Sequence, residues 1–205
     1  MQTDPFIAIT QGDVAGIGPE IVLQAVQNSE LRQRCRPLVI GHPKVLRRAA
    51  QIRPTVGEFQ AVELTDLPTD REALEAVFAA LPDHAVPVLN PCQEDVTRVR
   101  PGTVDAAAGE AACCCLLTAA RLASDGIVDA IATAPLNKES LHAAGHAFPG
   151  HTEILADFCG VDRFAMMLHV SEPRLGPLRS VIQSESVEAP GTRDRPHSGC
   201  GLSVA

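Results

Sequence analysis

The amino-terminal part of the chain has the pattern of a strand, a glycine-rich loop and a helix in direct succession, and this order restricts the possible folds most. Residues 6–10 are apolar and favour a strand, whereas residues 11–19 carry three glycines. Residues 20–27 have apolar side chains at helical spacing, and Pro19 falls in a first helical turn, where its missing N–H costs little. The pattern predicts a βα unit whose helix begins at the glycine-rich loop.

The same alternation continues along the chain. Further strands are predicted at 36–40, 61–64, 86–89, 126–134 and 163–170, and helices at 43–51, 70–81, 104–124 and 153–158. Such an order is typical of an α/β fold with a mainly parallel sheet and flanking helices. With 205 residues the chain can bury a sizeable core in one or two domains.

Two regions of different composition suggest the domain organisation. Residues 1–183 form the predicted α/β portion. Residues 184–205 are rich in Ser, Gly and Pro, and their apolar side chains follow neither the helical nor the strand period. Because this segment cannot bury enough apolar area to offset its ordering entropy, we expect it to be disordered.

Composition also argues against several classes of function. The net charge of −8 disfavours binding to nucleic acid, and a chain with six Phe and no Trp or Tyr lacks stacking platforms for bases. Apolar stretches such as 127–136 are too short to cross a bilayer, so no membrane span is predicted. The first residues contain no secretory signal, and we therefore expect a cytoplasmic protein.

Seven cysteines raise the question of a metal site or disulfides. Cys113, Cys114 and Cys115 are consecutive on a predicted helix, where neighbouring side chains diverge by about 100° and cannot converge on one ion. We expect them to be small, buried helix residues. The other four cysteines are isolated in the sequence and are predicted to be reduced thiols: Cys35, Cys92, Cys159 and Cys200.

A polar stretch directly after the strand at 126–134 is the best candidate for a functional site. It contains Lys138, His151 and Thr152, and ligands of parallel α/β sheets bind at the carboxyl ends of strands. The alternative is that Lys138 is simply solvated, Thr152 caps a helix and His151 is a loop residue. In the glycine-rich loop Asp13 would oppose an anion, which favours a structural or substrate-edge role for that loop.

These residues carry a resemblance to a known family. Thr133-Ala-Pro-Leu-Asn-Lys138, Ala144-Gly-His146 and Phe148-Pro-Gly-His-Thr-Glu153 are similar to the signature of the 4-hydroxythreonine-4-phosphate dehydrogenase family, and Ile9-Thr-Gln-Gly-Asp-Val-Ala-Gly-Ile-Gly-Pro-Glu20 is similar to its amino-terminal motif. That family includes relatives that act on phosphorylated four-carbon sugar acids. The resemblance implies the fold of isocitrate and isopropylmalate dehydrogenases.

The resemblance also implies a reaction and its site. It implies NAD-dependent oxidation of a small phosphorylated hydroxy acid, 4-phosphohydroxy-L-threonine in pyridoxal phosphate biosynthesis, with a divalent metal ion (Zn, Mg or Co) and a homodimer. By this resemblance His151 and Thr152 bind the phosphorylated substrate, and Lys138 and Asp13 are possible contacts on the substrate side. No residue of this chain is assigned as catalytic, as a cofactor ligand or as a metal ligand.

The chain departs from the family's pattern towards its carboxyl end. The family's first metal-binding histidine would fall near Val181, where there is none, and neither His169 nor His197 has the matching neighbours. The resemblance covers approximately residues 4–178. The sequence therefore predicts a truncated amino-terminal portion that lacks the carboxyl-terminal half and has no dehydrogenase activity alone.

Other functions stay open at this point. The chain could be related to 4-phospho-D-threonate or erythronate dehydrogenases, or it could be a noncatalytic fragment that binds a phosphorylated metabolite. A phosphate acyltransferase-like enzyme would share the α/β layout without NAD or metal motifs. The His-Thr block argues against this last alternative.

Overall fold

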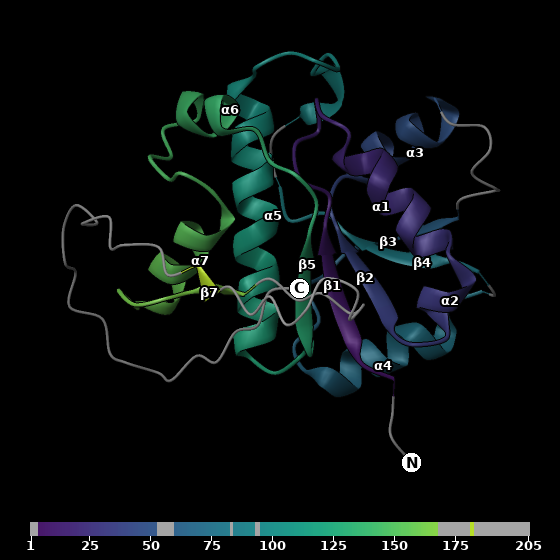
Figure 1. Ribbon diagram of the computed structural model, residues 1–205. Coiled ribbons are helices and arrows are strands. Elements are labelled where there is room, and N and C mark those ends of the chain that lie inside the picture. Colours follow the sequence, from purple (N-terminus) through teal and green to yellow (C-terminus); the bar gives the residue numbers. More distant parts are fainter. Residues whose placement is uncertain (1–3, 53–59, 83, 93–94, 168–180, 183–205) are drawn as a thin grey trace, which may run out of the picture.

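The computed structural model describes residues 4–52, 60–82, 84–92, 95–167 and 181–182, and it shows an α/β protein built on one parallel sheet (Figure 1). The sheet has five strands in the order β3-β4-β2-β1-β5, and a separate antiparallel pair is formed by β6 and β7. The strands are β1 (Phe6–Thr10), β2 (Arg36–Ile40), β3 (Ala61–Leu64), β4 (Val86–Leu89), β5 (Ala130–Thr133), β6 (Met166–Met167) and β7 (Val181–Ile182). The predicted α/β class with a mainly parallel sheet is confirmed.

Helices cover both faces of the sheet (Figure 1). The helical elements are α1 (Gly18–Gln27), α2 (Ser29–Arg32), α3 (Pro43–Ile52), α4 (Arg71–Ala80), the 3-10 turn η1 (Val96–Arg98), α5 (Ala106–Ser124), α6 (Lys138–Ala143) and α7 (His151–Cys159). One core cluster joins the sheet to α1 and α3, and another joins its opposite face to α4, α5, α6 and α7. The central strands are therefore apolar on both faces, as in other parallel sheets.

Alternation along β1 and β2 explains how one sheet serves two cores. Phe6 and Ala8 of β1 pack in the cluster with α5, whereas Ile9 packs in the cluster with α1 and α3. In β2, Ile40 likewise belongs to the α5 side and Val39 to the opposite side. Successive side chains of a strand point to opposite faces, so neither strand has a polar face to turn to solvent.

The structure corrects several element boundaries. The helix predicted at 104–124 begins at Ala106, because the Asp105 side chain accepts a hydrogen bond from the Ala107 N–H and caps it. The stretch around Lys138, predicted as a loop, contains α6, and the short elements α2 and η1 were not predicted. The strand expected at 163–170 is limited to Met166–Met167 in the part that the structure describes. The end of that predicted strand, residues 168–170, lies outside the described residues. The same holds for residues 184–205, which were predicted to be disordered.

Helix α5 is the central helix of its layer. It contacts β1, β2, β5, α6, α7 and η1, and most of its Ala, Cys and Leu side chains are buried. By length and hydropathy α5 could also cross a bilayer. It is longer than the apolar stretches, such as 127–136, on which the prediction of no membrane span was based. A mostly buried core helix passes the same test, so the property is weak evidence for a membrane.

Helix α6 is held against α5 by a close backbone approach. A Cβ at Gly109 of α5 would lie 2.0 Å from the Ser140 carbonyl oxygen, so only glycine fits there. The buried Ser140 Oγ also accepts a hydrogen bond from the Asp105 N–H at 3.2 Å. These contacts fix the start of α6, where Lys138 lies, relative to the rigid helix of the core.

Candidate functional site

The loops after β1 and β5 meet at the carboxyl edge of the sheet. The chain runs from β1 to β2 on one side and returns through α5 to β5 on the other, so the connections diverge between β1 and β5. Such a divergence is where parallel α/β sheets bind ligands. Here the Asp13 N–H donates to the Pro135 carbonyl oxygen at 2.9 Å, and the Ala134 N–H donates to Thr10 O at 3.2 Å.

The glycines of the loop after β1 serve close packing between backbones. Gly12 has φ +69°, and a Cβ there would lie 2.3 Å from the Pro135 carbonyl oxygen. A Cβ at Gly18 would lie 2.3 Å from the Gln11 carbonyl oxygen. The space beside Gly12 and Gly18 is thus occupied by the protein's own backbone. These two glycines do not form an open cradle for the phosphates of a dinucleotide.

Asp13 is buried at this edge with one carboxylate oxygen committed to the loop. Its side chain is 5% exposed, and Oδ1 accepts a hydrogen bond from the Ala15 N–H at 2.9 Å. Burial raises the pKa of Asp13, the Ala15 N–H lowers it, and the nearby Asp105 carboxylate raises it, with a net rise. The raised pKa means that the negative charge of Asp13 itself is costly in this buried position.

His151 is the first residue of α7 and faces the turn after β5. Its Nε2 lies 3.2 Å from the Ala134 carbonyl oxygen, and because a carbonyl can only accept, Nε2 carries the proton. Burial lowers the pKa of His151, while the Ala134 carbonyl and Glu153 act in the opposite direction. The neutral ring therefore leaves Nδ1 as an acceptor, and a protonated ring would offer Nδ1–H as a donor.

The start of α7 lacks a side-chain cap. Its N-cap residue is Gly150, which forms no side-chain hydrogen bond, whereas α6 is capped by Asn137, whose Oδ1 accepts from the Glu139 and Ser140 N–H groups. The half-buried Thr152 follows His151 in the first turn of α7. Unpaired N–H groups and the helix dipole make such a terminus favourable for an anion. The structure thus places Thr152 inside the helix rather than at its cap.

The sequence-predicted residues are brought together only in part. The Asp13 loop and His151 both contact the turn Ala134–Pro135, so they share one edge of the sheet, as predicted. Lys138 is exposed as the first residue of α6, and among the described residues it forms no ion pair. Its place one residue after the Asn137 cap fixes its backbone, but no contact ties its ammonium group to His151.

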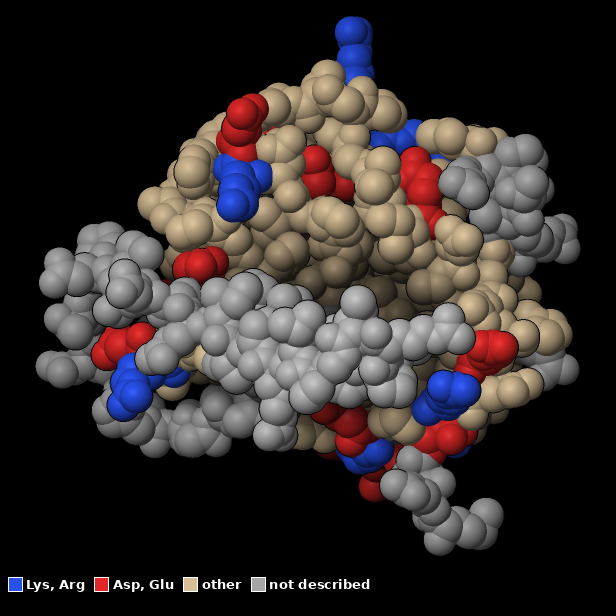
Figure 2. Space-filling view, in the orientation of Figure 1, with Lys and Arg blue, Asp and Glu red and all other residues tan. Residues whose placement is uncertain are grey.

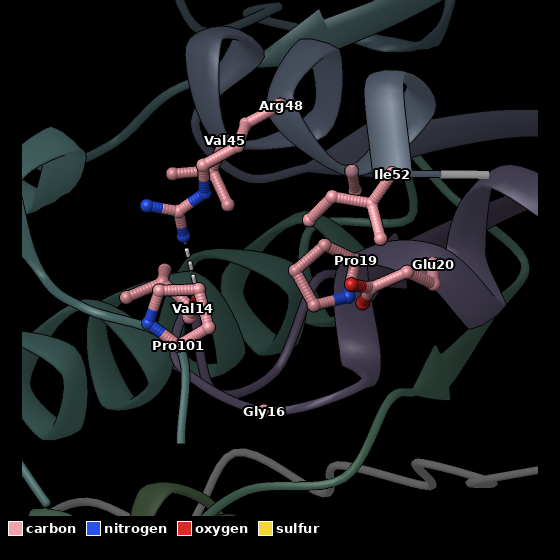
Figure 3. A pocket seen from close by; sticks show the side chains of 9 residues that line it. Val14, Gly16, Pro19, Glu20, Val45, Arg48, Ile52 and Pro101 are labelled. Carbon is pink, nitrogen blue, oxygen red and sulfur yellow. Dashed lines mark hydrogen bonds between the residues drawn. The ribbon is translucent and has the colours of Figure 1, made fainter. Parts of the chain in front are cut away.

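Arg48 is a residue that the sequence reading missed. From α3 it donates a hydrogen bond of 2.9 Å to the Val14 carbonyl oxygen (Figure 3). It donates another of 2.9 Å to the Val99 carbonyl oxygen, and the Gly102 N–H donates to Ala15 O at 2.7 Å. These bonds join the loop after β1 to the segment after η1. No sequence signal distinguishes Arg48 from the adjacent Arg47, because the partner atoms are backbone carbonyls distant in sequence.

A small cavity lies behind the glycine-rich loop, away from the Ala134 turn. Its volume of about 10 Å³ is enough for one water molecule. It is lined by Val14, Gly16, Pro19, Glu20, Val45, Arg48, Ala49, Ile52 and Pro101 (Figure 3). None of these residues is His151, Thr152 or Lys138. The cavity is too small for a phosphorylated metabolite and is separate from the His151 edge.

The described residues include no group of three or more His, Cys, Asp or Glu side chains that could hold a metal ion.

The consecutive cysteines of α5 are largely buried, as predicted, with Cys113 and Cys115 buried and Cys114 half-buried. Cys92, isolated in the sequence and a free thiol as predicted, has its sulfur 3.7 Å from that of Cys115. On the face seen in Figure 2 charged residues are scattered rather than gathered into a basic patch.

Comparisons with known proteins place this geometry in a family. A family model described as "Pyridoxal phosphate biosynthetic protein PdxA" matches residues 33–187, which include Lys138, His151 and Thr152 but not the glycine-rich block at 9–20. The match continues past residue 178, where the resemblance seen in the sequence ends. The family likeness therefore extends nine residues further, to residue 187.

Individual relatives agree with this match. The chain is 41% identical over 169 residues to a D-threonate 4-phosphate dehydrogenase of Pectobacterium atrosepticum, covering 82% of this chain and 48% of that protein. It is 39% identical over 164 residues to a 4-hydroxythreonine-4-phosphate dehydrogenase of Trichlorobacter lovleyi, covering 80% and 46%. A crystal structure of 4-hydroxythreonine-4-phosphate dehydrogenase from Klebsiella pneumoniae superposes with a TM-score of 0.70 at 36% identity, covering 82% and 48%. The chain spans about half the length of these relatives.

Proposed function

The chain belongs to the family of pyridoxal phosphate biosynthetic protein PdxA, and from this premise we propose that it forms the substrate-side half-site of a dehydrogenase for a small phosphorylated hydroxy acid. Relatives are named for 4-hydroxythreonine 4-phosphate and for D-threonate 4-phosphate, so either acid is a candidate ligand. His151 and Thr152 are the proposed binding residues. Asp13 and Lys138 are proposed to lie at the rim of the same site.

The single observation that carries the proposal is the uncapped start of α7 with His151 in its first turn. His151 Nε2 is occupied by Ala134 O, which fixes the ring with Nδ1 as its other polar atom. On binding a phosphate, a protonated His151 and the Thr152 hydroxyl can both donate to its oxygens, and the helix dipole adds favourable potential. Burial lowers the pKa of His151, and a bound anion would counteract this shift.

The reaction proposed for the complete dehydrogenase, of which this chain would form one half-site, is NAD-dependent oxidation of the phosphorylated hydroxy acid with a divalent metal, as the family resemblance implies. The described residues fit neither the metal ion nor NAD. They contain no cluster of three metal ligands, and the space beside Gly12 and Gly18 is occupied by protein backbone. No chemical step is therefore assigned to this chain's side chains. We propose that this half of the site binds and orients the phosphorylated end of the substrate. A homodimer, as the resemblance implies, and a cytoplasmic location, as expected from the first residues of the sequence, are part of the same proposal.

Calorimetric titration of the purified chain tests the binding step. The ligands are 4-phosphohydroxy-L-threonine, D-threonate 4-phosphate and the same acids without phosphate. We expect binding only of the phosphorylated acids, and a dissociation constant about tenfold or more higher in His151→Gln, because a charge-assisted hydrogen bond contributes about 1.5–3 kcal/mol. His142→Gln is the matched control, since His142 is exposed on α6. Equal affinity in both variants would remove His151 from the site.

A noncatalytic phosphorylated-metabolite binder is the second candidate function. It is favoured by the absence of a metal-ligand cluster among the described residues, since binding at the start of α7 needs no metal. Both candidates predict the same titration. They differ in turnover after the chain is mixed with the carboxyl-terminal half of a full-length relative, NAD and Mg²⁺, Zn²⁺ or Co²⁺, which only the half-site of a dehydrogenase would support.

A further inference from the structure

Sulfur atoms form the contact between the loop after β4 and helix α5. The Cys92 Sγ lies 3.7 Å from the Cys115 Sγ and donates to the Ala111 carbonyl oxygen at 3.5 Å. The Cys114 Sγ donates to the Pro91 carbonyl oxygen at 3.6 Å. Two cysteines that are 23 residues apart in the chain are therefore neighbours in the fold.

The geometry distinguishes Cys115 from the other cysteines of α5. Successive helix residues diverge by about 100°, so Cys113, Cys114 and Cys115 cannot all face one loop. Cys115 is fully buried beside the Cys92 sulfur, whereas the half-buried Cys114, which also interacts with Cys92, donates its thiol to the Pro91 carbonyl oxygen. Cys92 is half-buried and lies after β4, outside any helix or strand, so a small solute can reach its thiol.

We propose that Cys92 and Cys115 form an oxidation site, whose oxidant is a peroxide and whose product is an intramolecular disulfide. Hydrogen peroxide transfers one oxygen to the Cys92 sulfur, giving a sulfenic acid and water. The Cys115 sulfur then attacks the Cys92 sulfur and displaces the hydroxyl group as a second water. Overall, two thiols lose two electrons and two protons, and one peroxide is reduced to two waters.

The sulfurs must approach from 3.7 Å to about 2.05 Å for the bond to form, a movement assigned to the Cys92 loop. Oxidation of Cys92 is slow at neutral pH because its thiol is protonated. A hydrogen bond with Cys114 lowers the pKa of Cys92, but the bond with Cys115, burial and Glu110 raise it more, so the thiol stays protonated. The rate of oxidation should rise steeply at alkaline pH.

The disulfide would act on the carboxyl edge of the sheet. Downstream of Cys92 the same loop reaches Val99, which accepts from Arg48, and Gly102, which donates to Ala15 of the glycine-rich loop. Joining Cys92 to α5 therefore anchors both ends of a segment that packs on the loop carrying Asp13. The proposal does not depend on the proposed ligand or reaction.

Peptide mass spectrometry of the full chain tests the assignment. The chain carries Cys200→Ser, so that this cysteine cannot form a disulfide with the other six. The folded protein is treated with hydrogen peroxide at pH 8.5, quenched with acid and alkylated. We expect a peptide pair joined through Cys92 and Cys115, lighter by two hydrogens than the free pair and released by dithiothreitol. The unfolding midpoint of the oxidised chain should rise and return after reduction.

Variants separate the possible partners. Cys114→Ser should keep the crosslink, whereas Cys115→Ser and Cys115→Ala should both lose it. Cys35 is the matched single thiol, since among the described residues its Sγ hydrogen-bonds to Leu31 O and to no other cysteine, and it should be oxidised without an intramolecular partner. A crosslink between Cys92 and Cys114, or Cys92 recovered as an unpaired oxidised or free thiol under conditions that oxidise Cys35, would overturn the proposal.

Discussion

At the scale of single residues, the candidate site depends on side chains whose partners are backbone carbonyls. His151 is oriented by Ala134 O, and Arg48 holds Val14 O and Val99 O. Such partners lie far away in the sequence, and any residue type provides the same carbonyl group. Two predictions follow from the environment of these two side chains.

The lowered pKa of His151 makes stability depend on pH. Its folded-state pKa lies below the ordinary value of 6.5, so the stabilisation is fully present above about pH 6.5 and is lost as pH falls through the folded pKa. His151→Gln should flatten the loss of unfolding free energy between about pH 6.5 and pH 5, by at most about 1.4 kcal/mol per pH unit. Urea unfolding across this range measures it, with His142→Gln as control. Parallel curves for the two variants would contradict the burial of His151.

Removing the Arg48 guanidinium should loosen the glycine-rich loop. Arg48→Met leaves the Val14 and Val99 carbonyls without their donors, which should cost about 1–3 kcal/mol of unfolding free energy. Amide exchange of residues 12–18 should accelerate at the same time. Arg47→Met removes an exposed arginine next to it in α3 and should stay within about 0.5 kcal/mol of the native chain. Equal effects of the two substitutions would show that Arg48 is not a special contact.

At the scale of elements, the helix starts show which termini are satisfied locally. Helices α4, α5 and α6 begin after Asp70, Asp105 and Asn137, and each of these side chains accepts from a first-turn N–H. Helices α1 and α7 begin after Ile17 and Gly150 without such a bond. Of these two, α7 carries His151 and Thr152 in its first turn, and this combination points to α7 as the helix whose amino end can serve a ligand.

The contact between α5 and α6 gives a prediction whose sign is diagnostic. Replacing a helix-interior glycine by alanine normally stabilises by about 1 kcal/mol. Gly109→Ala should instead destabilise by about 1–3 kcal/mol, because its Cβ would lie 2.0 Å from Ser140 O and force α6 away from α5. Thermal unfolding measures the effect, and Ala123→Gly in the last turn of α5 reports helix propensity together with the loss of one half-buried methyl group. A stabilised Gly109→Ala would show that α6 is free to move.

At the scale of the whole molecule, the chain presents one edge of a parallel sheet and about half the length of its relatives. The described residues supply an anion-binding helix start but no cluster of metal ligands. Hydride transfer requires the donor and the reacting carbon to be aligned, which contributes about 7–11 kcal/mol to catalysis. Binding of the phosphorylated end cannot provide that alignment.

We therefore expect no dehydrogenase activity from the isolated chain. Absorbance of NADH should stay at background with 4-phosphohydroxy-L-threonine or D-threonate 4-phosphate, NAD and a divalent metal, even where calorimetry shows binding. A relative of full length, assayed in parallel, provides the positive control. Metal-dependent NADH production by this chain, abolished in His151→Ala, would prove the expectation wrong.

The sequence by itself determined the strand and helix order, because apolar periodicity and glycine or proline positions are local signals. Five of the predicted strands match β1 to β5, and the motif at 148–153 pointed to the start of α7. The sequence missed α6 and misjudged where the family likeness ends. In both cases a short polar or low-complexity stretch carries little periodic signal.

Only the tertiary structure decided which distant residues meet. It brought the Asp13 loop and His151 to one turn, joined Arg48 to two loops, and placed Cys92 beside Cys115. These contacts arise from strand order and from the packing of α5 across the sheet, which no local pattern encodes. Backbone carbonyls and buried thiols become specific partners only once the parallel sheet sets the distances between them.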